Sequence, residues 1–311
     1  MDGFSKHLIV IAGPTAVGKT STAIAVAEYF KTEIISADSR QFYKEMSIGT
    51  AVPSITELLR VKHHFIQHLS VNETYDVAEF EKDTVSLLEK HFINNNSVVL
   101  TGGSGLFIDA VCNGIDPMPD IFLEIREKVN NIFLNEGLSR LQQLTEEVDP
   151  TYFRTVDKQN PRRLQRALEV FFQTGNNLTF YRNTQKKTRN FRIIRIGLER
   201  DRFELIERIN ERTDLMLQEG LQEEVAGLVK FRYLNALNTV GYKEFFDYFD
   251  NKITLSEVPE LIKIATRQYA KRQMTWFKKN EAYQWFHPDH INDIIQFISL
   301  NMHNEVTSEK Q

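Results

Sequence analysis

The sequence predicts an α/β protein: a P-loop core with a parallel sheet, interrupted by a mainly helical insertion domain. Three observations predict this class. Short apolar runs recur, each followed by glycines and then by a helical stretch, which is typical of parallel sheets. A phosphate-loop pattern stands between the first such run and the first helical stretch. The chain has 311 residues, of which 41% are hydrophobic and 26% charged, as expected of an ordinary globular protein.

The first half of the sheet follows from local patterns. Residues 8–12 (LIVIA) are apolar and predict a strand, and the Ala-rich residues 19–30 predict a helix. Residues 33–37 (EIISA) and 98–101 (VVLT) predict two more buried strands, the second of which runs directly into glycines.

A helical segment then separates the two parts of the core. Pro117 and Pro119 interrupt the pattern, and helical spacing follows them to about residue 173. A polar, basic stretch comes next, and residues 191–198 (FRIIRIGL) return as a strand. We therefore expect a core of residues 1–116 and 196–311, and a helical insertion of residues 117–195. Residues at helical spacing predict one helix face in the insertion and another in the second part of the core. The first consists of Ile121, Ile125, Val129 and Ile132, and the second of Ile206, Ile209, Thr213 and Met216.

Several protein classes are excluded by composition. The single cysteine, Cys112, excludes a disulfide framework and a zinc or iron–sulfur site of the CxxC type. No apolar run approaches the roughly 18 residues of a membrane helix, and the start of the chain does not have the apolar region of a signal peptide. We expect a soluble cytoplasmic protein.

Basic residues are concentrated in two segments. The formal net charge is −4, which by itself argues against a nucleic-acid partner. However, residues 158–195 and 263–279 together carry +15, so the rest of the chain carries −19. Each run alone can be a solvated helix face, but two such runs in an acidic protein favour a polyanionic partner.

The motif GPTAVGKT matches the phosphate loop G-x-x-x-x-G-K-[ST] in its expected place between a strand and a helix. Glycines let the backbone curl so that its N–H groups face an anion, and the following helix adds its positive end. The lysine adds a mobile charge, and the last hydroxyl is suited to Mg²⁺. The predicted diphosphate- or nucleotide-binding residues are Gly13, Pro14, Thr15, Ala16, Val17, Gly18, Lys19 and Thr20.

The carboxylate that hydrolysing P-loop enzymes carry after a later strand is missing here, because residues 98–101 run into glycines. The carboxylate that does follow a strand is Asp38. It can be a helix N-cap, a magnesium holder or a general base, and its place at the carboxyl end of a strand beside the P-loop favours the active site.

Several segments in one order resemble the tRNA dimethylallyltransferases (tRNA isopentenyltransferases) of the bacterial type. They cover nearly the whole chain: GPTAVGKT (13–20), ISADSRQFYKEMSIGTA (35–51), HHF (63–65), YDVAEFEKD (75–83), TGGSGLFIDAVCNG (101–114), NPRRLQRALEVF (160–171), ERINERTDLMLQEGL (207–221), NALNTVGYKE (235–244) and QYAKRQMTWFK (268–278). The resemblance implies transfer of a dimethylallyl group from dimethylallyl diphosphate to N6 of adenine-37 in tRNA, with release of pyrophosphate. It also implies that the P-loop holds the diphosphate of the prenyl donor in place of ATP, and that Mg²⁺ is the cofactor.

The resemblance also implies residue roles. Asp38 would orient the amine and take its proton, while Lys19, Arg212, Thr15 and a Mg²⁺ ion on Thr20 would stabilise the departing diphosphate. The target base would be flipped out of the anticodon loop. The implied tRNA contacts are Asp38, Ser39, Arg40, Gln41, Ser104, Arg126, Arg162, Arg163, Leu164, Gln165, Arg166, Thr239, Val240, Gly241, Tyr242, Lys243, Lys271, Arg272 and Gln273.

Lys263, Arg267 and Lys271 have helical spacing on one face, where like charges repel unless an anion lies opposite. We expect tRNA phosphates to be that anion. The alternatives are an adenylate isopentenyltransferase, which needs no such basic surface, a P-loop kinase, and a nucleotide-gated RNA-binding module. We expect a monomer.

Overall fold

The computed structural model describes residues 6–182 and 187–303. The chain forms two compact units, which divide between Asn113 and Gly114 and again between Thr188 and Arg189. We call them the sheet unit, which contains both ends of the chain, and the helical unit between the two divisions. Residues 189–195, which the sequence-based division placed in the insertion, belong to the sheet unit, where a strand begins at Arg192, and residues 114–116, which it placed in the core, belong to the helical unit.

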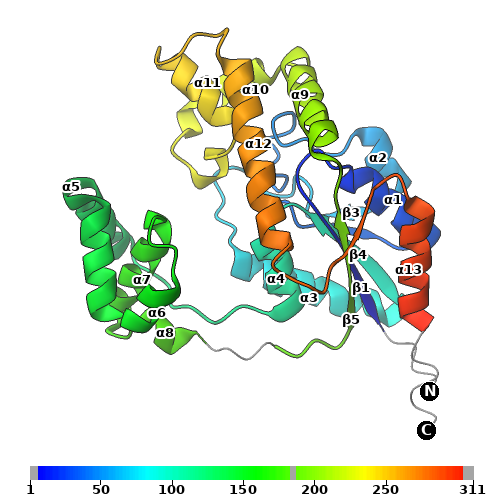
Figure 1. Ribbon diagram of the computed structural model, residues 1–311, viewed down its shortest axis with the longest axis horizontal. Helices are drawn as coiled ribbons and strands as arrows, with labels where there is room; N and C mark the ends of the chain where they lie inside the picture. The colour runs from blue at the N-terminus through cyan, green and yellow to red at the C-terminus, as the bar shows by residue number, and fades with distance from the viewer. Residues whose placement is uncertain (1–5, 183–186, 304–311) are drawn as a thin grey trace. The chain divides into compact units, whose positions relative to one another are not determined.

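The sheet unit has six parallel strands in the order β3-β2-β4-β1-β5-β6 (Figure 1). The strands are β1 (His7–Ala12), β2 (Ile34–Ser36), β3 (His63–His64), β4 (Ser97–Gly102), β5 (Arg192–Leu198) and β6 (Gln284–Phe286). The central strand β1 pairs with β4 on one side and β5 on the other. The four strands predicted from the sequence are confirmed, whereas β3 and β6 are too short to leave an apolar run.

Alternate residues of β1 face opposite sides of the sheet, and each side has its own hydrophobic core. Leu8 and Val10 pack in one core, and Ile9 and Ile11 in the other. The helices α1 (Lys19–Tyr29) and α13 (Ile291–His303) cover the Ile9 side, as Figure 1 shows at its right. The helices α3 (Val77–Asn94) and α4 (Gly105–Asn113) cover the Leu8 side.

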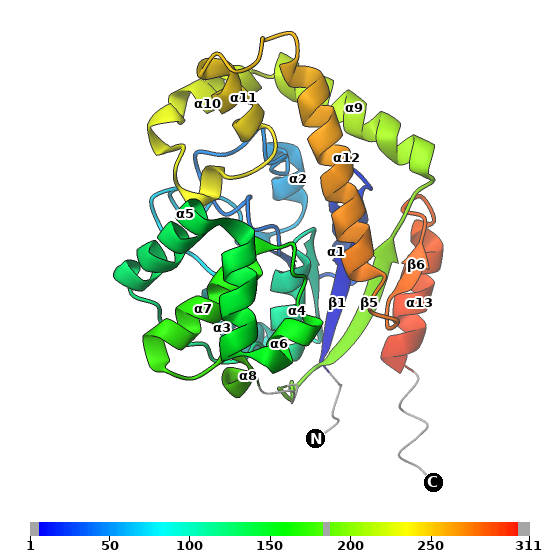
Figure 2. The same cartoon turned by 60° about the vertical axis from the view of Figure 1, so that its left-hand side comes forward.

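The remaining helices of the sheet unit follow β5 along the chain, except for one short helix that precedes β3. The long helices α9 (Arg202–Gln218) and α12 (Val258–Phe277) contact each other, and α10 (Leu221–Gly227) and α11 (Tyr242–Phe249) lie beside them (Figure 2). The stripe predicted along α9 is buried at Ile209, Thr213 and Met216. The shorter elements are α2 (Ile55–Arg60), η1 (Val229–Phe231) and η2 (Asn235–Leu237).

The helical unit consists of α5 (Leu123–Val148), α6 (Pro150–Thr155), α7 (Pro161–Thr174) and α8 (Leu178–Tyr181). The helix α5 is kinked at Gly137, whose φ of 75° only glycine adopts readily. The buried carboxylate of Asp149 caps α6 and accepts hydrogen bonds from the N–H and hydroxyl of Thr179, at 2.8 and 2.6 Å. This carboxylate therefore joins α6 to α8.

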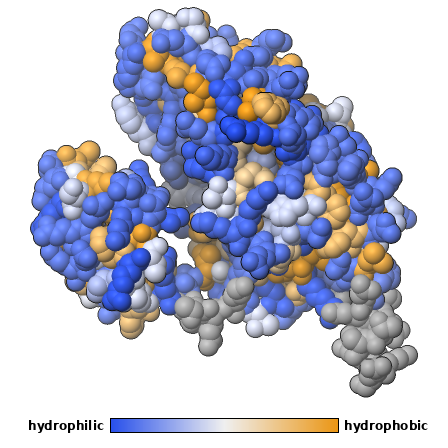
Figure 3. Space-filling model, in the orientation of Figure 1, coloured by the Kyte–Doolittle hydropathy of each residue, from blue (hydrophilic) through white to orange (hydrophobic). Residues whose placement is uncertain are grey.

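Within the described residues, no helix is both long enough and apolar enough to cross a bilayer. On the face drawn in Figure 3, most of the surface is hydrophilic, and the hydrophobic patches are small and separate.

Candidate active site

The P-loop lies between β1 and α1, at the carboxyl end of the central strand. Two glycines are needed there for different reasons. A side chain at Gly13 would lie 2.8 Å from the carbonyl oxygen of Leu198, because β5 passes directly behind the loop. Gly18 has a φ of 110° and caps α1, a conformation that other residues rarely adopt. The loop is therefore shaped by its own sequence and by the neighbouring strand.

Hydrogen bonds to neighbouring side chains fix the first part of the loop. The backbone N–H of Thr15 donates to Gln273 Oε1 at 2.8 Å, and Arg212 donates to the Thr15 hydroxyl at 2.6 Å. Lys19 Nζ folds back to the carbonyl oxygens of Pro14 and Gly13, at 2.7 and 3.1 Å. The N–H of Thr15 is thus engaged within the protein, so the N–H groups nearer α1 are the ones that can face an anion.

Asp38 follows β2 at the same edge of the sheet as the P-loop. Its Oδ1 accepts a 3.2 Å hydrogen bond from the backbone N–H of Arg40, and residues 39 and 40 form a turn. Because no helix begins here, the helix N-cap interpretation is wrong. The adjoining wall is tight: a side chain at Gly102 would lie 2.3 Å from the carbonyl oxygen of Ala37. This close approach of β4 to residue 37 holds the residue just before Asp38.

The candidate site is a cavity of about 890 Å³ in the sheet unit. It brings together Lys19, Thr20, Asp38 and Arg212 from the P-loop, the segment after β2, and α9. The other predicted residues in its lining are Thr15, Ala16, Gly18, Ser39, Arg40, Gln41, Thr239, Val240, Gly241, Lys243 and Arg272.

The cavity is electrostatically suited to an anion with a carboxylate beside it. Burial lowers the pKa of Lys19 to about 8, with the Asp38 charge opposing this shift and the Arg212 charge adding to it. Burial also lowers the pKa of the Arg212 guanidinium from its ordinary value. Two desolvated cations therefore lie near one carboxylate, and a bound anion would stabilise the charged form of both.

Some predicted tRNA-contact residues use their polar groups within the sheet unit. Arg40 donates to the carbonyl oxygens of Asn235 and Ala236, at 2.7 and 3.1 Å. The Gln41 amide donates to the carbonyl oxygen of Ala51 at 2.9 Å, and Ser104 donates to Ser39 at 3.1 Å. These side chains shape the walls of the cavity, and their contacts with tRNA stay a prediction.

Two others are buried. Tyr242 is fully buried and donates to Glu224 at 2.6 Å, so its side chain supports the loop around Gly49 from inside the core. Gln273 is 6% exposed and donates to the carbonyl oxygen of Gly103 at 2.9 Å while accepting from Thr15. A side-chain contact with tRNA at either position would require the core to open.

The remaining predicted contacts belong to the helical unit. Arg126 lies on α5, and residues 162–166 lie on α7. Arg162 and Arg163 are exposed, whereas Leu164 and Gln165 are buried. Arg166 is 3.6 Å from Glu169. This change from exposed to buried follows from helix geometry, because successive side chains turn around the helix axis and reach different faces.

The basic runs are partly neutralised by acids from elsewhere in the chain. Lys263 pairs with Asp214 at 2.6 Å, and Arg267 pairs with Glu260 at 2.8 Å. The expectation that these two cations need phosphate opposite them is therefore wrong. Lys271 is exposed and lines a second cleft, of about 620 Å³, between α9 and α12.

Among the lining residues that sequence reasoning missed are Arg208 and Tyr269. Arg208 stands four residues before Arg212 on α9, so helical spacing would have placed both on one face. Burial raises the pKa of the Tyr269 hydroxyl, and the nearby Asp38 charge adds to the shift. No local signal distinguishes this tyrosine from a core residue.

Comparisons with known proteins identify this arrangement. The profile described as IPP transferase matches residues 41–280. The chain belongs to the IPP transferase family. The residues that this profile matches begin after the P-loop, whereas alignments with individual relatives cover nearly the whole chain. A tRNA dimethylallyltransferase 1 of Bacteroides fragilis is 46% identical over 298 residues, covering 96% of this chain and 99% of that protein. A tRNA dimethylallyltransferase of Christiangramia forsetii is 49% identical over 285 residues, covering 92% and 94%.

Solved structures of the IPP transferase family share the fold. The full-length tRNA isopentenylpyrophosphate transferase of Bacillus halodurans has a TM-score of 0.73 and 31% identity, and covers 98% of this chain and 100% of its own. A eukaryotic dimethylallyltransferase, solved acting on tRNA, has a TM-score of 0.70 and 27% identity, with 88% and 70% covered. The P-loop fold class predicted from the sequence and the family resemblance are both confirmed.

Proposed function

We propose that this protein transfers a dimethylallyl group from dimethylallyl diphosphate to N6 of adenine-37 in tRNA, releasing pyrophosphate. The observation that carries the proposal is the cavity that holds Lys19, Arg212 and Asp38 together, in a chain of the IPP transferase family. The cations suit the diphosphate, and the carboxylate suits an amine. A kinase or hydrolase site would need groups directed at a P–O bond, whereas this reaction breaks a C–O bond.

The reaction couples one bond breaking to one bond forming. The N6 lone pair attacks C1 of the dimethylallyl group, and the electron pair of the C1–O bond leaves with the diphosphate. The Asp38 carboxylate takes the proton that N6 loses. Lys19, Arg212 and the P-loop N–H groups nearest α1 stabilise the negative charge that grows on the diphosphate.

The donor set near Lys19 fits Mg²⁺, which prefers oxygen ligands and retains several waters. Thr20 offers a hydroxyl and Asp38 a carboxylate in the lining of the same cavity. We infer that Thr20 holds the ion. When bound, Mg²⁺ would neutralise part of the diphosphate charge.

The tRNA would contact the residues around the mouth of this cavity and the exposed arginines of the helical unit. Arg162 and Arg163 on α7 and the exposed Lys271 and Arg272 on α12 are the candidates with the freest side chains. We further propose that the enzyme works as a monomer in the cytoplasm, because one chain supplies every group that the reaction uses.

The deciding experiment incubates the protein with labelled dimethylallyl diphosphate and an unmodified tRNA. We expect label on the adenine, dependence on Mg²⁺, and a loss of about 10²–10⁴-fold in turnover for Asp38→Asn, since that variant cannot take the proton. Asp250→Asn, a surface carboxylate paired with Arg232, is the matched control. Absence of label on tRNA, equal turnover of free AMP, or full activity of Asp38→Asn would overturn the proposal.

A further inference from the structure

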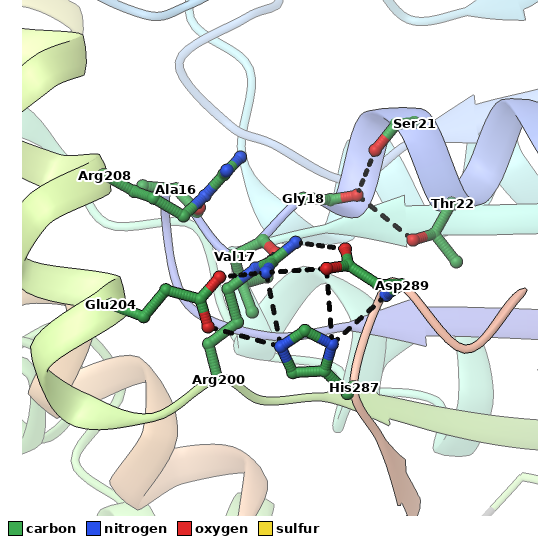
Figure 4. Close-up of polar contacts among 10 residues, drawn as sticks. All are labelled: Ala16, Val17, Gly18, Ser21, Thr22, Arg200, Glu204, Arg208, His287 and Asp289. Atoms are coloured by element: carbon green, nitrogen blue, oxygen red, sulfur yellow. Dashed lines mark hydrogen bonds and ion pairs between the residues drawn. The ribbon is translucent and has the colours of Figure 1, made fainter.

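A second set of charged residues lies behind the P-loop, outside the candidate cavity. Arg200 precedes α9, and its side chain is only 6% exposed. Its Nε donates to the carbonyl oxygen of Val17 at 2.9 Å. The rest of the guanidinium contacts Asp289, with NH2 to Oδ1 at 2.7 Å, as well as Glu204 and His287 (Figure 4). Every nitrogen of this nearly buried guanidinium therefore has a partner within the protein.

The three possible metal ligands of this cluster do not form a free metal site. Glu204, His287 and Asp289 offer ligand atoms within 4.8 Å of one another, which is the spacing of a metal centre. The guanidinium of Arg200 lies among them, and it contacts all three. The chain therefore supplies its own cation, and a metal ion would first have to displace it. This points to a positioning role for the cluster.

The segment that holds Arg200 also packs against the loop directly. Pro288, between His287 and Asp289, is buried, and a side chain at Gly18 would lie 3.4 Å from its Cβ. The segment after β6 therefore contacts two successive P-loop residues: Gly18 through Pro288, and Val17 through Arg200. We call Arg200, Glu204 and residues 287–289 the loop brace.

The brace fixes the direction of one N–H group. In a trans peptide, the C=O of one residue and the N–H of the next point in opposite directions. Because Arg200 holds the Val17 carbonyl on the outer side, the Gly18 N–H is directed toward the inner side. One residue earlier, Arg208 donates to the carbonyl oxygen of Ala16 at 2.9 Å, and Ala16 has a φ of 64° that a non-glycine residue adopts only with support. Two successive carbonyls are thus held by arginines.

We propose that Arg200 is a positioning residue: held by Glu204, His287 and Asp289, it keeps the Gly18 N–H directed at the diphosphate of the prenyl donor. This rests on the proposed function, which places that diphosphate in the P-loop. Gly18 lines the candidate cavity. Arg200 lines instead the second cleft, on the side of Pro14 and α9, so it acts through the loop.

The test measures binding of inorganic pyrophosphate by calorimetry, together with KM and kcat for dimethylallyl diphosphate. Losing a charge-assisted hydrogen bond to Val17 should raise the dissociation constant of pyrophosphate and the donor KM roughly tenfold in Arg200→Ala. The KM for tRNA should stay the same. Arg200→Lys should recover part of the loss, since an ammonium can reach one acceptor but not four partners.

Two further variants keep the test decisive. Arg232→Ala removes a comparable two-pronged arginine–aspartate pair with Asp250, and we expect it to leave pyrophosphate binding unchanged. Asp289→Asn alters an aspartate that is 66% exposed, so the protein should fold even if Arg200→Ala does not. It should weaken pyrophosphate binding several-fold, and adding it to Arg200→Ala should cause no further loss.

The outcomes separate the two proposals. If wild-type protein binds pyrophosphate and modifies tRNA while Arg200→Ala and Asp289→Asn bind pyrophosphate as wild type does, the brace proposal is overturned and the function stands. An equal loss in Arg232→Ala would also overturn it, because the effect would then reflect general stability. Wild-type protein that binds no pyrophosphate would contradict the proposed function as well.

Discussion

Gln273 joins helix α12 to the P-loop: its Oε1 accepts a 2.8 Å hydrogen bond from the backbone N–H of Thr15. Its amide nitrogen donates to the carbonyl oxygen of Gly103 at 2.9 Å. One buried side chain therefore spans the loop that would hold the diphosphate and the wall that follows β4. Thr15 is close to Lys19 along the chain, and Gly102, next to Gly103, packs against the carbonyl oxygen of Ala37, just before Asp38. This bridge therefore sets the width of the site.

Replacing Gln273 by Leu should destabilise the protein by about 1–3 kcal/mol, because the partly buried Thr15 N–H and the buried Gly103 carbonyl lose their partner. It should also raise the donor KM, since the loop loses an anchor. Chemical denaturation and steady-state kinetics measure the two effects. Thr275→Ala, on the exposed side of the same helix, is the control and should change neither. A Gln273→Leu protein with wild-type stability would contradict the bridge.

Affinity for the diphosphate should fall as pH rises through about 8, where the pKa of Lys19 lies. The ammonium is the form that attracts the anion, and burial makes it lose its proton below the ordinary value of 10.5. The donor's own phosphate titration ends near pH 6–7, since its last pKa is about 6. Calorimetric titration with dimethylallyl diphosphate, without tRNA, between pH 7 and pH 9.5 measures the dependence. Lys19→Met should bind more weakly at every pH, with a flat profile; a sloping profile in that variant would assign the titration to another group.

Gly102→Ala should disturb the site, because the new Cβ would lie 2.3 Å from the carbonyl oxygen of Ala37. The backbone must move to make room, so we expect a loss of about 1–3 kcal/mol in stability and a lower kcat through displacement of Asp38. Gly227→Ala, in α10, meets no atom within 4 Å and should be neutral or stabilising by up to about 1 kcal/mol. Thermal unfolding compares the two variants. Equal stability would contradict the prediction, because the backbone at Ala37 would then move aside without cost.

Lys271 and Lys263 should differ in their contribution to tRNA binding, although both lie on α12. Lys263 is paired with Asp214, whereas Lys271 is exposed at the edge of the second cleft. Lys271→Ala should reduce the slope of log affinity against log salt by about one, as loss of one phosphate contact does. Lys263→Ala should change the slope less. Filter binding of tRNA at several salt concentrations measures both, and equal slopes would remove Lys271 from the tRNA surface.

Features that depend on neighbouring residues can be predicted from the sequence. The strand at residues 8–12, the glycines of the P-loop and the helix after it form one continuous segment, so local patterns predict the loop and its place. The other predicted strands follow from short apolar runs, and the ordered motifs identify the family. The position of Asp38 beside the loop follows from a general rule, because the carboxyl ends of parallel strands lie at the same edge of the sheet.

Which distant side chains meet depends on how the strands and helices pack, and local patterns do not predict it. Thr15 and Gln273 are 258 residues apart, and Arg200 and Asp289 are 89 apart. Charge counts did not predict that Asp214 neutralises Lys263, and family motifs did not predict that Tyr242 is buried. What a polar side chain does depends on its partner, and the sheet order and helix packing bring that partner near. The sequence therefore predicts the chemistry of the site, and the packing around it decides which residues carry that chemistry and which hold them in place.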